Sequence, residues 1–232
     1  MVRRVAIIPA RGGSKRIPKK NIMEFKGKPM IAWTISAARD SKMYERIIVS
    51  TDDEEIAEVS KKYGAEIPFL REEHVDDHST VSQAVAWTLK RMKEIDNIAY
   101  DNVTSLMPNC PMRDSAGIID SLKNFESKDL TFQISCFEYG WMNPWWAFKI
   151  SPKGDPEAIF KDVKNVRSQD LDKLYCPTGA IWIAKAEALE KSEDFYGEGF
   201  ELFPISWKDA VDIDNYEDLE IARALYEQKD RN

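Results

Sequence analysis

Hydrophobic and polar positions follow two alternating patterns along most of the chain. Short apolar runs, such as 5–8 and 46–50, are typical of strands that are buried on both faces of a sheet. Apolar residues at helical spacing follow the first run in 29–39, where Pro29 suits a first helical turn. This alternation predicts an α/β fold with a doubly wound, mostly parallel sheet.

The other predicted elements continue the same alternation. We expect strands at 65–69, 103–107, 130–136, 179–184 and 202–205, and helices at 54–63, 80–95, 114–125, 185–191 and 216–228. No internal repeat and no Gly/Ser linker divides the sequence. We therefore expect residues 1–232 to form a single domain.

The alternation breaks between residues 137 and 175. An aromatic and proline-rich segment, FEYGWMNPWWAF, begins this region, and β-like pieces follow at 146–150 and 158–161. An edge hairpin with its own small core is one interpretation. However, Trp141, Trp145 and Trp146 form more aromatic surface than an isolated hairpin should expose to water. We expect 137–175 to be an inserted dimerisation arm.

Composition and charge limit the classes of partner. The chain is 43% hydrophobic and 31% charged, as in globular proteins. It has no apolar run of about 20 residues and no signal-peptide pattern, so we expect a cytoplasmic protein without a membrane partner. The net charge of −7 argues against nucleic acid. The first 30 residues are strongly cationic with Glu24 as their single acid, which indicates a small polyanion such as a nucleotide.

Cysteine usage indicates neither a disulfide framework nor a zinc site. Cys110, Cys136 and Cys176 are odd in number and far apart.

A basic, glycine-containing loop follows the first predicted strand. After Pro9 come Gly12 and Gly13, together with the cations Arg11, Lys15, Arg16, Lys19 and Lys20. Glycines let backbone N–H groups approach an anion and cations neutralise it, so this loop is suited to phosphate, although a solvated basic turn is the simpler alternative. The loop matches neither the Walker pattern nor the G-x-G-x-x-G dinucleotide fingerprint.

A pair of carboxylates precedes the last predicted helix. In an extended segment Asp212 and Asp214 lie on the same face, where they repel each other unless a cation lies between them. Hard oxygen ligands suit Mg²⁺. The alternative is that one of the two simply caps the helix.

Three motifs resemble one known family. The sequence P-A-R-G-G-S-K-x-x-P-x-K-N over 9–21 resembles the nucleotide-binding signature of the cytidylyltransferases that activate nonulosonic acids, the acylneuraminate cytidylyltransferase family. R-x-Q-x-L over 167–171 and D-I-D-N-x-x-D-L-E over 212–220 resemble that family's sugar-binding and metal motifs. The resemblance implies a Rossmann-like nucleotidyltransferase fold, CTP and a sialic-type acid as substrates, and a CMP-sugar and pyrophosphate as products.

The resemblance also implies roles for individual residues. Residues expected to bind the nucleotide are Arg11, Gly12, Gly13, Ser14, Lys15, Lys20, Asn21, Arg71, Ser79 and Thr80. Residues expected to bind the sugar acid are Met107, Arg167, Gln169 and Thr178, and the arm of residues 137–175 is expected to bind the sugar acid as well as to form the dimer. Asp212 and Asp214 are expected to hold Mg²⁺, or Mn²⁺ in its place, and Lys15, Arg11 and Asp212 are expected to act in catalysis.

Some of these positions have simpler alternatives. Ser79 and Thr80 could act as N-caps of the helix that follows, with or without a ligand. Arg167 presents the planar donor that a carboxylate selects, yet it could be an ordinary surface arginine. His74 and His78 lie in an acidic loop, and we expect them to be solvated.

The sugar-binding positions depart most from the family pattern. Met107 stands where many sialate enzymes have glutamine, and Cys176 and Thr178 replace an arginine and an asparagine. Arg16 and the segment 137–139 look more like the pseudaminate branch, so the acceptor stays open among sialic, legionaminic and pseudaminic acids. Alternatives are a 3-deoxy-octulosonate cytidylyltransferase, another sugar nucleotidyltransferase, and a non-catalytic nucleotide-binding homologue.

Overall fold

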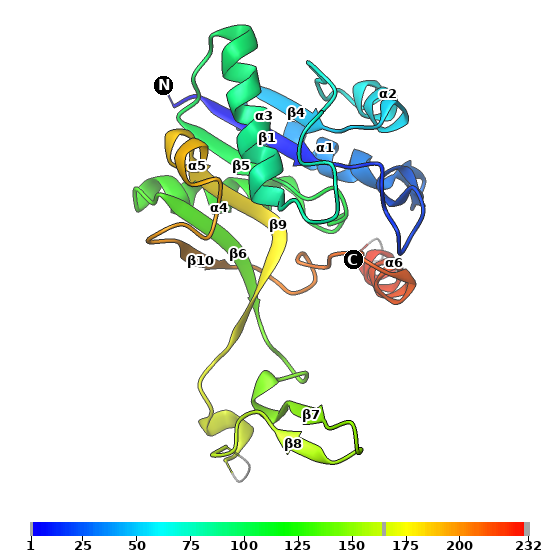
Figure 1. The fold of residues 1–232 in the computed structure, drawn as a ribbon, viewed down its shortest axis with the longest axis vertical. Coiled ribbons are helices and arrows are strands. Elements are labelled where there is room, and N and C mark those ends of the chain that lie inside the picture. The colour runs from blue at the N-terminus through cyan, green and yellow to red at the C-terminus, as the bar shows by residue number, and fades with distance from the viewer. Residues whose placement is uncertain (1, 164–165, 230–232) are drawn as a thin grey trace.

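A six-stranded sheet forms the centre of the computed structural model, which describes residues 2–163 and 166–229. Its strand order is β10–β6–β9–β5–β1–β4 (Figure 1). The strands are β1 (Arg4–Pro9), β4 (Arg46–Ser50), β5 (Asn102–Ser105), β6 (Phe132–Glu138), β9 (Tyr175–Lys185) and β10 (Glu201–Pro204). Strand β9 runs antiparallel to β5 and β6, and the other pairs are parallel. The mostly parallel α/β fold expected from the sequence is confirmed.

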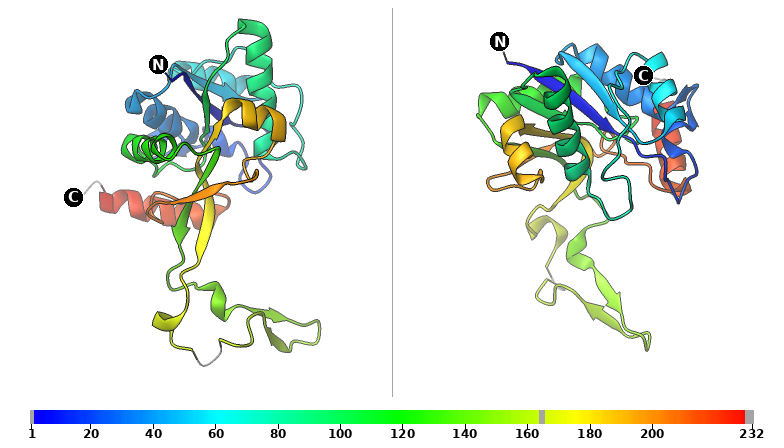
Figure 2. Two further views of the ribbon diagram at one scale, coloured as in Figure 1. Left: turned by 90° about the vertical axis from the view of Figure 1, so that its left-hand side faces the viewer. Right: turned by 45° about the horizontal axis from the view of Figure 1, so that its top comes forward.

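Helices cover both faces of the sheet (Figure 2). Successive side chains of a strand point to opposite faces. Ala6 and Ile8 therefore pack in one core with α1 (Met30–Ser41), α2 (Glu54–Lys62) and α4 (Ser115–Ser127). Val5 and Ile7 pack in the other with α3 (Val81–Asp96) and α5 (Ala186–Ser192). The near-continuous apolar run of β1 is explained by this two-sided burial.

A third, smaller core joins the loop after β1 to the last helix, α6 (Tyr216–Lys229). The loop continues through a 3-10 turn, η1 (Lys20–Ile22), and a short hairpin of β2 (Glu24–Phe25) and β3 (Lys28–Pro29). Apolar side chains from the loop, the hairpin, α1 and α6 meet there: Ile17, Phe25, Met30, Ile213, Leu219 and Ala222. Packing in this core fixes the basic loop against the segment that carries the carboxylate pair.

An extended arm projects from the sheet between β6 and β9 (Figures 1 and 2). It contains η2 (Pro144–Trp146), a hairpin of β7 (Phe148–Ile150) and β8 (Pro156–Ala158), and η3 (Ser168–Asp170). Trp145 packs against Phe160 and donates its Nε1–H to the Asp172 carbonyl at 2.9 Å. Trp141 and Trp146 remain 85% and 43% exposed. The arm's own core therefore covers part of the tryptophan cluster.

The strand predicted at 65–69 is wrong. Glu66 forms a single bridge beside Ile48, with backbone hydrogen bonds to Ile47 and Val49, and the chain then leaves the sheet. Pro68 has no N–H to extend the ladder, and Phe69 packs edge-on against Trp87 of α3 instead. Strand β9 differs in the other direction, because it begins at Tyr175 in the stem of the arm.

No helix in residues 2–163 or 166–229 combines the length and the apolar character needed to cross a lipid bilayer.

A half-buried ion pair connects the first strand to α4 and gives a stability prediction. Arg4 Nη2 donates to Glu126 Oε2 at 2.8 Å, and Asn102 donates to the same carboxylate at 3.2 Å. The hydrogen bond from Arg4 holds the pKa of Glu126 below its ordinary value of 4.5, although burial opposes this. We expect Glu126→Gln to lower the free energy of unfolding by about 1 kcal/mol at pH 7.

The pH dependence of this loss distinguishes a charge effect from a packing effect. A lowered folded-state pKa stabilises the protein above the unfolded pKa, and the contribution disappears as pH falls through the folded pKa. The difference between wild type and Glu126→Gln in chemical denaturation should therefore shrink below about pH 4.5. Glu58→Gln, on the surface of α2, is the control and should change stability little. An equal loss at all pH values would contradict the assignment.

Candidate active site

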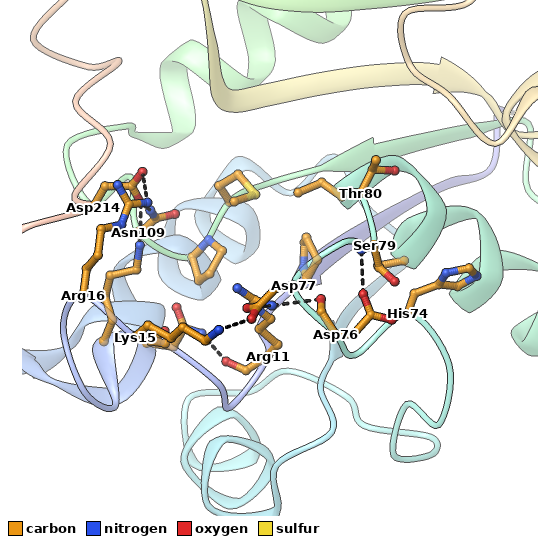
Figure 3. Close-up of a pocket in the computed structure, with 18 of the residues that line it drawn as sticks. Arg11, Lys15, Arg16, His74, Asp76, Asp77, Ser79, Thr80, Asn109 and Asp214 are labelled. Atoms are coloured by element: carbon orange, nitrogen blue, oxygen red, sulfur yellow. Dashed lines mark hydrogen bonds and ion pairs between the residues drawn. The ribbon is translucent and has the colours of Figure 1, made fainter. Parts of the chain in front are cut away.

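A cavity of about 460 Å³ lies where the carboxyl ends of β1, β4 and β5 meet (Figure 3). Open α/β sheets bind ligands at this edge, beside the point where the chain switches sides of the first strand. The residues that line it are Pro9, Arg11, Ser14, Lys15, Arg16, Ile17, Lys20, Asn21, Arg71, His74, Asp76, Asp77, Ser79, Thr80, Val81, Ala84, Met107, Pro108, Asn109 and Asp214. Ten of the residues expected from the sequence to form the site are among them.

The basic loop is held in a fixed turn at the mouth of β1. Ala10 donates its N–H to the Ser50 carbonyl at 2.9 Å, which extends the pairing of β1 with β4 beyond Pro9. Ser14 donates its N–H to the Gly12 carbonyl at 2.9 Å, and the buried Asn21 donates its amide to the Arg11 carbonyl at 3.0 Å. Asn21 thus closes the loop from inside.

Gly12 serves the packing of this loop more than the approach of a ligand. A Cβ on Gly12 would lie 2.7 Å from Asp53 Oδ2, and its N–H already donates to Asp52 Oδ1 at 2.9 Å. Neither Gly12 nor Gly13 lines the cavity. From the sequence we expected both glycines to bind phosphate through their backbone N–H groups. The structure gives no support for this at Gly12, because its N–H already donates to the Asp52 carboxylate. Gly13 has open space around its Cα.

Four cations of the loop line the cavity, and each is bound to a carboxylate. Arg11 and Lys15 both donate to Asp77, Arg11 at 2.8 Å. Lys20 and Arg16 donate to the two oxygens of Asp214 at 2.8 and 2.6 Å.

Arg71 lines the side of the cavity opposite the basic loop. Its Nη1 donates to the carbonyl and the hydroxyl of Ser50 at 2.8 and 3.0 Å, while its buried Nε has no partner. Burial lowers the pKa of Arg71, and the positive charge of Arg11 acts in the same direction against the charge of Asp52. The guanidinium is thus fixed in place with part of its donor capacity unused.

Ser79 and Thr80 combine a structural task with a place in the cavity wall. Thr80 is the N-cap of α3 and forms a capping box with Gln83, and Ser79 donates its N–H to Asp76 at 2.9 Å. Both residues also line the cavity. The two alternatives drawn from the sequence are therefore compatible.

The carboxylates of Asp212 and Asp214 converge on one amide. Asn109 Nδ2 donates to Asp212, to the Ile213 carbonyl at 3.0 Å and to Asp214 at 3.4 Å. Burial, followed by the charge of Asp214, raises the pKa of Asp212 to about 6. Burial would also raise the pKa of Asp214, but the hydrogen bond and charge of Lys20 lower it below its ordinary value. Asp214 lines the cavity, whereas Asp212 is not among the lining residues.

These residues fit a magnesium ion. Asp212 carries a carboxylate whose charge is poorly compensated, and the neighbouring Asn109 Oδ1 is buried without a partner. Mg²⁺ is usually held by one or two carboxylates, with water and phosphate oxygens as its remaining ligands. Among the described residues no group of three or more His, Cys, Asp or Glu side chains gathers as a metal site. A Mg²⁺ ion here would thus depend on the substrate for part of its coordination.

Three expected sugar-binding residues lie outside the cavity of their own chain. Thr178 is buried in β9 and donates its hydroxyl to the Ala210 carbonyl at 3.0 Å, so its side chain is used inside the protein. Arg167 pairs with Asp170 at 2.8 Å, and Gln169 lies beside it in η3. Both belong to the projecting arm (Figure 1). The sugar-binding roles of these three residues stay predictions, and within one chain they do not meet at this cavity.

Met107, the fourth expected sugar residue, does line the cavity. Its Cγ lies 2.6 Å from the place that a Cβ would take on Gly179, so glycine is required there by the close approach of Met107.

Several residues of the cavity were not expected from the sequence. Asp76, Asp77 and Asn109 were given no role from the sequence, and their contacts are with residues far away in the chain. His74, expected to be solvated, lines the cavity. His74 also has an unusual backbone conformation, with a φ of 55°.

The open α/β sheet, with a cationic cavity at the carboxyl ends of its strands, is a fold shared with solved structures. Among solved structures, CMP:2-keto-3-deoxy-manno-octonic acid synthetase complexed with CTP superposes with a TM-score of 0.72, over 98% of this chain and 99% of that one, at 18% identity. The 4-diphosphocytidyl-2C-methyl-D-erythritol synthase of Anaerococcus prevotii superposes with a TM-score of 0.65, over 97% and 99% of the two chains, at 14% identity. At these identities the likeness shows the fold.

The chain belongs to the cytidylyltransferase family, whose pattern matches residues 5–230. It is 34% identical to the pseudaminic acid cytidylyltransferase of Campylobacter jejuni over 228 residues, which covers 97% of both proteins. It is also 34% identical to the CMP-N,N'-diacetyllegionaminic acid synthase of Legionella pneumophila over 232 residues, again 97% of both. The family indicated by the sequence motifs is confirmed.

Proposed function

We propose that this chain transfers CMP from CTP to a nonulosonic acid and releases pyrophosphate. The observation that carries the proposal is the cavity itself, in which Lys20 of the basic loop binds Asp214, one of the two carboxylates that share the Asn109 amide. Similarity to enzymes named for pseudaminic and legionaminic acid supports this class of acceptor. Because the reaction uses CTP, we also propose that it takes place in the cytoplasm.

In this mechanism the protein positions the reactants and stabilises charge. Lys15 and Arg11 neutralise the triphosphate and the pyrophosphate that leaves. Arg71, which is hydrogen-bonded to Ser50, orients the cytosine. Its donors would bind O2 and N3 of cytosine and so favour cytosine over uracil. Asn21 fixes the loop around the phosphates and contributes to the ribose side of the cavity.

Asp212 and Asp214 would hold the Mg²⁺ ion that this chemistry needs. When bound, the ion supplies charge stabilisation at the phosphate and lowers the pKa of the attacking anomeric hydroxyl. Asn109 donates to both carboxylates and so holds them close to each other. Asp212 therefore acts in catalysis as a ligand.

A pyrophosphate-release assay with CTP tests the proposed function. N-acetylneuraminate, legionaminate, pseudaminate and 3-deoxy-octulosonate are offered separately, and UTP replaces CTP in a parallel series. We expect turnover with CTP and with at least one of the first three acceptors. Octulosonate is the second candidate because of the shared fold. Binding of CTP with no release for any acceptor would indicate a non-catalytic nucleotide-binding protein.

We propose further that the enzyme is a homodimer formed through the arm, residues 137–175. The arm exposes a group of large apolar side chains that a single chain leaves uncovered: Trp141, Met142, Trp146, Phe148 and Ile150. Exposed patches of this kind are typical of protein interfaces. A dimer would also let Arg167 and Gln169, which lie away from their own cavity, reach the cavity of the second subunit.

Disrupting the arm should separate the subunits. We expect the double change Trp141→Glu and Ile150→Glu to convert a dimer into a monomer in light scattering, because each side chain is more than three-quarters exposed in the single chain. Ile95→Glu, an exposed apolar position on α3, is the control and should leave the mass unchanged. A wild-type protein that is itself monomeric would contradict the dimer.

Mixed dimers test where Arg167 acts. One subunit carries Lys15→Ala, which inactivates the cavity of its own chain. The other subunit carries Arg167→Ala. If Arg167 serves the second subunit, one of the two cavities keeps both residues and activity returns on mixing. If Arg167 serves its own chain, both cavities are defective and the mixture stays inactive.

A further inference from the structure

Asp77 binds two of the cations that the proposed reaction requires. Its carboxylate accepts from Arg11 Nη1 at 2.8 Å and from Lys15 Nζ (Figure 3). Arg11 also donates to the Asp76 carbonyl at 2.8 Å. Asp77 comes from the loop before α3, which forms the wall opposite the basic loop. The two walls of the cavity are therefore tied together through one carboxylate, and we call this group of Arg11, Lys15 and Asp77 the clasp.

The clasp contributes little to the stability of the fold. The side chains of Asp77 and Lys15 are 40% and 78% exposed, and ion pairs between exposed groups are weak. The turn itself is shaped by Asp76, whose Oδ1 accepts from the N–H groups of His78 and Ser79 at 2.7 and 2.9 Å. The carboxylate of Asp77 is thus presented to the cations by a turn that does not need it.

Phosphate and the Asp77 carboxylate require the same donors. The hydrogen bond from Lys15, followed by smaller effects that include the charge of Arg11, lowers the pKa of Asp77, so the group is negative at neutral pH. A triphosphate in the cavity would bring further negative charge close to it, and like charges at short range repel. The guanidinium and ammonium groups bind phosphate at least as well as they bind a carboxylate. The two anions therefore compete for the same positive charge.

Building on the proposed function, we infer that Asp77 competes with the nucleotide for Arg11 and Lys15. It holds both cations before CTP binds, yields them to the β- and γ-phosphates, and takes them back as pyrophosphate leaves. A protein in which the competent state is only partly populated binds its ligand more weakly by that fraction. Asp77 therefore lowers the affinity for CTP and, by the same factor, for pyrophosphate, which favours release of the product.

Titration calorimetry with CTP and with inorganic pyrophosphate, in Mg²⁺ buffer without acceptor, tests this inference. Asp77→Asn removes the charge and keeps the shape of the side chain. We expect the Kd for both ligands to fall about 3- to 10-fold, the size expected for the loss of weak, exposed ion pairs. Asp77→Glu keeps a carboxylate and should bind close to the wild-type affinity. Asp120→Asn, 68% exposed on α4, controls for the change in net charge and should have no effect.

The outcomes separate the competing roles of Asp77. An unchanged Kd in Asp77→Asn would overturn the inference, since it would mean that the carboxylate has no effect on binding. A higher Kd would also overturn it, since it would mean that the carboxylate positions the cations for phosphate. Equal tightening in Asp120→Asn would also overturn it, because the effect would come from net charge. Wild-type protein that binds no CTP would count against the proposed function itself. Thermal melting of each variant verifies that it is folded.

Discussion

Replacing Lys15 with alanine is expected to lower kcat for pyrophosphate release about 100-fold or more. Lys15 lines the cavity and carries its charge at the end of a side chain that is 78% exposed, so it can move onto the phosphates. Removing one donor that is aimed at charge developing in the transition state typically costs about 100- to 1000-fold. Stability should be unaffected, because the ion pair of Lys15 is exposed.

Lys19 provides the matched control on the same loop. Its side chain is 67% exposed and pairs with Glu55 outside the cavity. Lys19→Ala removes the same charge from the same segment, and we expect kcat to stay within about twofold of wild type, since exposed pairs away from a site contribute little. A loss of well under ~10-fold for Lys15→Ala, or an equal loss for both variants, would remove Lys15 from the mechanism.

Asp212→Asn should abolish activation by Mg²⁺ and lower kcat by at least ~100-fold. A metal ion contributes several kcal/mol of charge stabilisation at a phosphoryl centre, and each 1.4 kcal/mol is about a factor of ten in rate. The substitution keeps the size of the side chain and removes one of two carboxylates that share the Asn109 amide. The measurements are kcat as a function of Mg²⁺ concentration and Mg²⁺ binding by calorimetry.

Asp129 is a suitable control for the loss of an acidic side chain. It is 88% exposed and lies in a left-handed turn that asparagine tolerates well. Asp129→Asn should keep the wild-type response to Mg²⁺. If Asp212→Asn also keeps that response, the ion binds elsewhere; Asn215 and Asp218, and not the carboxylate pair, cap α6.

The fold was predictable because its sheet is buried on both faces. The apolar run of β1 and the helical spacing in α1 are local signals, and both are read directly from the sequence. Position 65–69 has the same apolar character, yet a proline and a competing contact with Trp87 keep it out of the sheet. That competition between segments has no local signal. The full length of β9 could not be predicted from the sequence either, because its first residues, from Tyr175, lie in the stem of the arm.

The site was predictable where a single segment carries the chemistry. Lys15, Lys20 and Asn21 stand in one continuous motif, and the structure places all three in the cavity. Asp77 and Asn109 were missed because their roles arise from contacts across the fold. Arg167 shows the opposite limit, since its motif was recognisable but carries no information about where the arm places it relative to the cavity.

The third core affects the order in which the enzyme folds during its synthesis. Lys20 and Asp214 bind each other across 194 positions of sequence, and they are brought together when Ile213, Leu219 and Ala222 pack against Ile17 and Phe25. During synthesis the basic loop leaves the ribosome long before the carboxylates do, and domains fold from the N-terminal side as they emerge. A nascent chain can therefore form its first strands and its basic loop while it still lacks the carboxylate pair. Under the proposed mechanism, catalytic competence follows the docking of α6.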